Sequence, residues 1–123
     1  MVKETENKLQ IIPKIERYIE YMLNVIMKLP RVEKFNIGNE YKQSMYQMLE
    51  DTMYISKITD KKKCLELVNK IDARLNSQRV FLRIMQKQRW IDTKKFNVVM
   101  NLIYEIGKIL GGLTKYYAKN DSK

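Results

Sequence analysis

Apolar residues recur along the chain at the spacing of amphipathic helices. Over about residues 9–29 they lie three and four positions apart and form one stripe, which consists of Ile12, Ile15, Ile19, Met22, Ile26 and Leu29. A stripe of this kind is the face that a helix buries against its neighbours. Pro13 falls in the first turn of this predicted helix, where its missing N–H is tolerated, and Pro30 ends the helix.

Three further stripes predict helices over about residues 37–58, 61–88 and 93–117. Their members are Ile37, Tyr41, Met45, Met48, Thr52 and Ile55; then Cys64, Leu67, Val68, Ile71, Leu75, Gln78, Leu82 and Met85; then Phe96, Val99, Ile103, Ile106, Leu110, Leu113 and Tyr117. Thr59 or Asp60 can cap the third helix and Asp92 the fourth. Four helices with short links predict an all-α fold, an antiparallel up-down-up-down four-helix bundle in which residues 1–123 form a single domain.

The third and fourth predicted helices carry more apolar residues than one buried face requires. A second apolar stripe lies outside the main ones and consists of Ala73, Ser77, Val80 and Ile84 on the third helix and Val98, Leu102, Ile109 and Tyr116 on the fourth. One buried stripe per helix is enough for a bundle, so the second stripe favours an interface between copies of the chain. The alternative is that these residues pack under a terminal segment or widen the core of one chain.

The chain is basic, with a net charge of +10, and the excess lies in its second half. Residues 60–92 contain nine Lys and Arg against four Asp and Glu, and residues 93–123 contain six against two. Basic residues, together called the basic row, border the apolar stripes of the third helix: Arg79, Arg83 and Lys87 along one flank, Lys70 and Arg74 on the other, and Arg89 at its end. Such a row can follow a phosphate backbone, so we expect RNA or DNA as a partner; a merely solvated basic surface is the alternative.

Composition removes most catalytic and metal-binding chemistry. The chain has no histidine and a single cysteine, Cys64, which excludes zinc sites, a Cys–His pair, a Ser–His–Asp triad and the Glu-x-x-His motif of di-iron bundles. We therefore expect no cofactor, no metal and no enzymatic activity, with carboxylate-only chemistry through Glu50, Asp51 or Glu105 as the alternative. No apolar run approaches 18 residues and the first ten residues are polar, so we expect a cytoplasmic protein without a membrane partner.

Three glycines, Gly107, Gly111 and Gly112, lie within the last predicted helix. Each costs about 1 kcal/mol relative to alanine inside a helix. Either Gly111 or Gly112 ends the helix in the left-handed conformation, or the glycines form a small-residue face that another helix approaches closely. The apolar stripe continues to Tyr117, which favours close helix packing.

The same stretch resembles a known family. EIGKILGGLTKY, preceded by RVFLRIMQKQRWIDTKKFNVVMNLI, resembles the C-terminal half of the Avd family, the accessory variability determinants of diversity-generating retroelements. That family overlaps the S23 ribosomal proteins encoded in intervening sequences of 23S ribosomal RNA genes. The link KLPRVEKF is similar to the family's junction of Lys, an apolar residue, Pro, a basic residue, any residue, Glu, Lys and Phe. The resemblance covers about residues 10–117, and it departs at Leu113, where members commonly have tryptophan.

The resemblance implies a homopentamer of four-helix bundles, shaped as a barrel with a basic surface. In retroelements such a protein binds the reverse transcriptase and the template RNA and supports mutagenic complementary-DNA synthesis. The family's basic positions on the third helix correspond to Arg74, Arg79 and Arg83. The alternative is a stand-alone bundle of the ribosomal-RNA intervening-sequence type, with no reverse transcriptase partner.

Overall fold

The computed structural model describes the backbone of residues 2–121 and the side chains of residues 10–119. Four long helices and one short helix make up this part of the chain: α1 (Val2–Met27), α2 (Arg31–Phe35), α3 (Ile37–Ile55), α4 (Lys61–Lys87) and α5 (Thr93–Asp121). No strand occurs within residues 2–121. The predicted all-α bundle is therefore confirmed.

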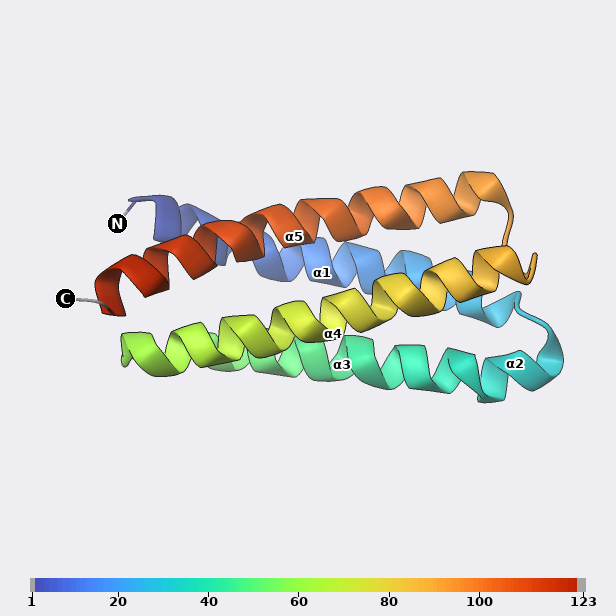
Figure 1. Ribbon diagram of the computed structural model, residues 1–123, viewed down its shortest axis with the longest axis horizontal. Helices are drawn as coiled ribbons and strands as arrows, with labels where there is room; N and C mark the ends of the chain where they lie inside the picture. Colours follow the sequence, from blue (N-terminus) through green and yellow to red (C-terminus); the bar gives the residue numbers. More distant parts are fainter. Residues whose placement is uncertain (1, 122–123) are drawn as a thin grey trace.

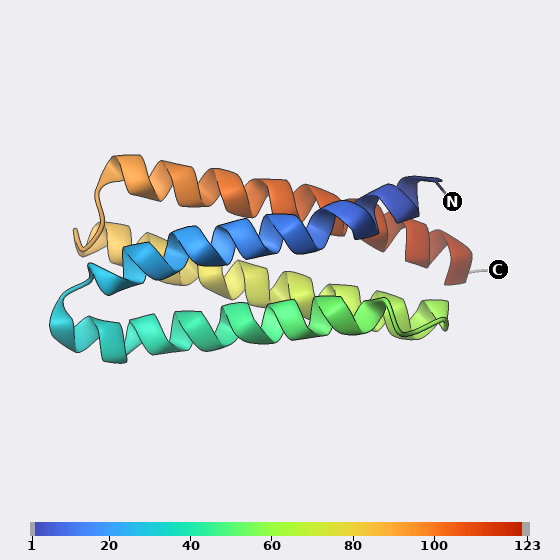
Figure 2. The ribbon, with the colours of Figure 1, turned by 180° about the vertical axis from the view of Figure 1, so that it is seen from behind.

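The long helices lie side by side as a ring of four (Figure 1). α1 packs against α3 and α5, and α4 packs against the same two helices from the other side. Figures 1 and 2 both show the two termini at one end of the molecule, together with the α3–α4 link. The opposite end is formed by α2 and the α4–α5 link.

The predicted stripes line the core between these helices. All of their members are buried except four, which are partly buried: Ile12, Ile37, Leu67 and Phe96. α1 buries a wider face than its predicted stripe, since Ile11, Tyr18 and Val25 are buried as well. The periodicity therefore identified the inward face of each long helix, and the neighbours of α1 cover more of it than one stripe.

Helix boundaries differ from the predicted ones where the backbone makes tighter turns. α1 ends at Met27 because Leu29 N–H bonds to the carbonyl of Ile26, three residues back, at 3.1 Å. The next residues were predicted as an irregular link but form α2, a single helical turn that opens with Glu33 N–H on the Pro30 carbonyl at 2.9 Å. α4 begins at Lys61, and Asp60, one of the two predicted capping residues, is its N-cap, because the Asp60 carboxylate accepts the N–H of Lys62 at 2.9 Å.

Gly38 sets the position of α2 and of the first turn of α3. A Cβ atom at this residue would lie 3.0 Å from Cγ2 of Ile26 and 3.2 Å from the carbonyl oxygen of Glu33. Both distances are shorter than ordinary contacts, so any larger residue would push α3 away from α1 and α2. The glycine thereby fixes the corner at which α2 projects from the bundle.

Candidate nucleic-acid and oligomer interface

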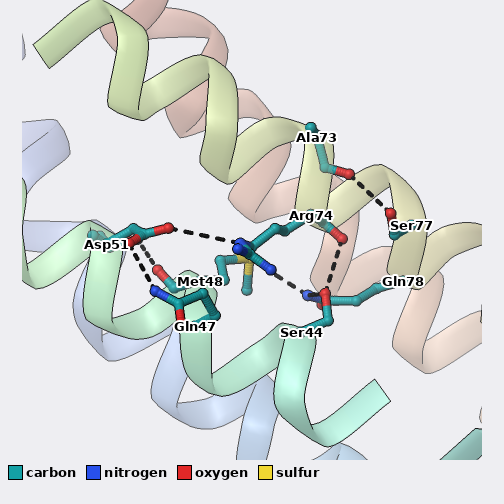
Figure 3. A network of polar contacts seen from close by, with 9 residues as sticks. Ser44, Gln47, Met48, Asp51, Ala73, Arg74, Ser77 and Gln78 are labelled. Atoms are coloured by element: carbon teal, nitrogen blue, oxygen red, sulfur yellow. Dashed lines mark hydrogen bonds and ion pairs between the residues drawn. The ribbon is translucent and has the colours of Figure 1, made fainter. Parts of the chain in front are cut away.

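A buried polar network fixes how α4, which carries the basic row, sits against α1 and α3. Tyr18 donates a hydrogen bond to Gln78 Oε1 at 2.6 Å, and the amide nitrogen of Gln78 donates to Ser44 Oγ at 3.0 Å. Ser44 in turn donates to the backbone carbonyl of Arg74 at 3.4 Å, as Figure 3 shows. These bonds join three helices through groups that water does not reach, which sets the rotation of α4 about its axis.

Arg74 forms an ion pair with a buried carboxylate, and its side chain is 34% exposed. Its Nε is 3.7 Å from Oδ2 of Asp51, which is buried on α3, and the other carboxylate oxygen of Asp51 accepts the amide of Gln47 at 3.0 Å (Figure 3). Arg74 Nε itself is buried and makes no hydrogen bond. Of the predicted nucleic-acid contacts, Arg74 is therefore already engaged within the chain.

Arg79 lies against α5. Its Nη2 occupies the space beside Gly107, where a Cβ atom would come within 3.0 Å of it, and its Nη1 donates to the side chain of Asn76. Tyr18 has a raised pKa, mainly because it is buried, and the positive charge of Arg79 opposes part of this rise. The guanidinium thus fills the α4–α5 crossing and leaves only part of its surface to solvent.

The rest of the basic row faces solvent. Exposed side chains are found at Lys70, Arg83, Lys87 and Arg89. Arg89 has a φ of 63°, and no other non-glycine residue of the described backbone has a positive φ. Arg89 N–H bonds to the carbonyl of Gln86 and Trp90 N–H to that of Met85, both at 2.9 Å, which is the paired closure of a Schellman motif.

Most of the second apolar stripe is also on the surface. Val80 is 45% exposed, Ile84 40% and Val98 37%, and Ala73 and Ser77 are exposed beside them. Leu102 and Tyr116 are partly buried against the core. One member was assigned wrongly: Ile109 is only 6% exposed in the single chain, because α5 turns it into the core beside Leu110. It is not available to a second copy.

The profile of the bAvd-like family matches residues 9–117, which is nearly the whole chain. This chain belongs to the bAvd-like family. Comparison with curated proteins and with solved structures gave no match.

The glycines of this bAvd-like chain do not end its last helix. α5 runs on to Asp121, and none of the glycines among the described residues has a positive φ. Gly107 does sit at a close approach, but its neighbour is the Arg79 side chain and not the backbone of another helix. A Cβ atom at Gly111 would meet nothing within 4 Å. Within one chain no helix approaches Gly111, which is exposed, and Gly112 is partly buried, so close packing at these glycines stays a prediction.

Sequence reasoning missed a second exposed apolar group on this bAvd-like protein. Met27, Val32 and Phe35 are 65%, 66% and 66% exposed at the end of the bundle that contains α2. Val32 and Phe35 lie in the one-turn helix α2, which is too short to show a periodicity, and Met27 lies outside the buried stripe of α1. The signal that could have found Val32 and Phe35 is the apolar content of the short link.

The described residues of the bAvd-like chain contain neither a cluster of metal ligands nor a helix that could span a membrane. No group of three or more His, Cys, Asp or Glu side chains lies close enough together to hold a metal ion within that part of the chain. Nor does any helix there have the length and apolar character needed to cross a bilayer.

Proposed function

We propose that this bAvd-like protein is a non-catalytic oligomeric accessory protein that binds RNA or DNA and serves a retroelement reverse transcriptase in mutagenic complementary-DNA synthesis. The observation that supports this most directly is on α4. Val80 and Ile84 are exposed apolar residues, and Arg83 and Lys87 are exposed cations that alternate with them along the same helix. A surface of this composition suits a protein that assembles through apolar contacts and collects phosphates on the flanks.

The mechanism in this proposal is electrostatic. Assembly through the second apolar stripe would bring the exposed cations of several chains together, and each chain contributes a net charge of +10. A field of that size raises the local concentration of polyanions and releases their counterions on binding. Such binding is steeply salt-dependent and weakly selective for sequence, as a general accessory to a polymerase in the cytoplasm requires.

The proposal also includes the up-down-up-down topology of each chain. In a barrel-shaped homopentamer all five subunits would have this topology and the same orientation. The links between the long helices alternate between the two ends of the molecule, which supports it. In this arrangement α4 and α5 are neighbours, so their exposed apolar residues can form one continuous contact with another copy.

A solution mass measurement tests the assembly. The wild-type chain is expected to have five times the 14.8 kDa mass of one copy, and Ile84→Lys is expected to reduce that mass. Tyr46→Lys, which adds the same charge at another exposed apolar residue on α3, is the matched control and should leave the mass unchanged. A mass of 14.8 kDa at all concentrations would contradict the proposal.

Salt-dependent binding tests the partner. Affinity for RNA should fall steeply as salt rises, and Arg83→Gln should reduce the slope of log K against log salt by about 0.7 to 0.9. Lys14→Gln removes the same charge from α1, where Lys14 pairs with Glu105 at 3.1 Å, and should leave the slope unchanged. An affinity that does not depend on salt would rule out phosphate contacts.

Copurification tests the role. A reverse transcriptase encoded beside this gene should copurify with the protein and require it for complementary-DNA synthesis. If no such enzyme is encoded there, the stand-alone bundle of the intervening-sequence type is the function class that remains.

A further inference from the structure

Phe35 stands on the outside of the molecule although the chain has a well-filled core elsewhere. Its side chain is 66% exposed, and none of the five residues of α2 is buried. Val32, one helical turn earlier on the same short helix, is exposed to the same extent. A large aromatic ring in this position adds little to folding.

The neighbouring residues of this link have structural roles that Phe35 lacks. Leu29 is buried at 3% exposure, the Pro30 carbonyl accepts the first hydrogen bonds of α2, and the Glu33 carbonyl packs on Gly38. The Phe35 carbonyl accepts the side-chain amide of Asn39, but its ring is not part of the core cluster. The fold therefore explains the backbone of this turn and leaves the ring without a role.

Three cations precede Phe35 closely in the sequence. Arg31, one helical turn before Phe35, is exposed, Lys34 precedes it directly and is partly buried, and Lys28 is exposed just before α2. Residues four apart in a helix are neighbours on its surface, so Arg31 and Phe35 share one side of α2. Glu33 is the one acidic residue within the stretch 27–35.

The same end of the bundle carries more positive charge. Figures 1 and 2 place the α4–α5 link beside the end that contains α2, and this link includes the exposed Arg89. Arg89 has a left-handed backbone, which is unfavourable for an arginine, and its side chain is exposed in this link. A nucleic acid bound at this end would therefore meet cations from α2 and from the α4–α5 link.

We propose that Phe35 is a stacking platform for an unpaired base of RNA or DNA, with Arg31 and Lys34 binding the flanking phosphates. The inference rests on the proposed function, and it adds a site and a preference for single strands. Unpaired bases offer their faces to an aromatic ring, whereas bases in a duplex are already stacked on each other. Charge favours this occupant over an uncharged apolar partner, because three cations lie among the eight residues that precede Phe35.

Binding of a labelled oligoadenylate of about 12 nucleotides tests the inference. Phe35→Leu keeps an apolar side chain but removes the ring, and it should weaken binding by about tenfold. Phe35→Tyr keeps the ring and should bind like the wild type. Tyr46→Leu removes an exposed ring from α3, away from α2, and should have no effect.

An abasic oligonucleotide of the same length separates stacking from charge. Wild type and Phe35→Leu should bind it equally, because it has the phosphates and lacks the bases. Equal losses on both probes would overturn stacking, and so would a change in the solution mass of Phe35→Leu, which would make α2 an interface between copies. Circular dichroism is expected to show that the variant keeps its helices, since the ring is on the surface.

The two proposals fail in different ways. If Phe35→Leu binds oligoadenylate as well as the wild type does, and both lose affinity with salt, the stacking site is wrong and the proposed function stands. If the wild type binds neither oligonucleotide at low salt, both are wrong.

Discussion

Tyr18 on α1 and Gln78 on α4 are joined in the core by a hydrogen bond of 2.6 Å, from the phenol to the amide oxygen. A phenol has one proton to donate, so the second contact of Tyr18, at 2.6 Å to the hydroxyl of Tyr41, must be donated by Tyr41. The chain of bonds continues from Gln78 to Ser44 and has one direction throughout. Removing one member leaves a buried donor or acceptor on each of its neighbours without a partner.

Gln78→Leu should therefore lower the free energy of unfolding by about 1 to 3 kcal/mol, because it deprives both Tyr18 and Ser44 of a buried partner. Urea denaturation followed by circular dichroism measures this. Ser77→Ala, at the adjacent exposed position, should change stability by less than about 0.5 kcal/mol. If the two variants were equally stable, the network would contribute nothing.

Stability should fall at high pH because the two core tyrosines resist ionisation. Burial raises the pKa of both Tyr18 and Tyr41 above the ordinary value of 10.0. Below that value both tyrosines are neutral in the folded and unfolded states, and the stabilisation is complete. Above it the unfolded chain loses protons that the folded chain keeps, so the free energy of unfolding falls by up to about 1.4 kcal/mol per pH unit for each tyrosine.

Ultraviolet absorbance during an alkaline titration measures this effect. Tyr18 and Tyr41 should ionise only when the protein unfolds. Tyr41→Phe should reduce the number of late-ionising tyrosines by one, and a smooth titration of all eight tyrosines in the folded protein would contradict the burial of the pair.

Arg89→Gly should stabilise the protein by about 1 kcal/mol. The residue has a φ of 63°, a conformation that glycine adopts without the steric cost that a Cβ atom brings. Arg89→Ala is the matched control: it removes the same charge but keeps the Cβ atom, and should bring no gain. Thermal unfolding of the three proteins distinguishes the backbone effect from the charge effect.

Periodicity predicted the long helices because each of them packs one face against the core over many turns. It failed for α2, where five residues are too few to repeat a pattern and the turn is stabilised by the Pro30 carbonyl. It also failed for Ile109, which lies at the border of the main stripe of α5. The angular position of a residue on an ideal helix does not show how much of that helix its neighbours cover, and here the neighbouring helices cover Ile109.

Candidate site residues were less predictable than the fold, because a basic residue near a helix surface has several possible neighbours. Arg74 and Arg83 look alike in the sequence, yet only Arg74 meets a buried carboxylate, which comes from α3. Gly107 and Gly111 are four residues apart on one helix, but Arg79 crosses only the first. Such differences depend on contacts between helices that are distant in sequence.

Two glycine substitutions should have opposite effects. Gly111→Ala should stabilise a single chain by about 1 kcal/mol, because the position is helical and nothing lies within 4 Å of the added Cβ atom. Gly38→Ala should destabilise it, because the Glu33 carbonyl, a backbone atom, lies 3.2 Å from the added atom. Urea denaturation of both variants checks the signs, and a gain at Gly38 would contradict the close approach of α2 and α3.

The placement of both chain ends opposite α2 has a practical meaning for experiments on this molecule. A 27-residue helix such as α4 is roughly 40 Å long, so a tag or surface linker on either end of the chain is held about that far from Phe35. Immobilisation through such a linker leaves α2 and Arg89 pointing into solution. The molecule can thus be immobilised at the end that contains the termini while ligands bind at the end that contains α2.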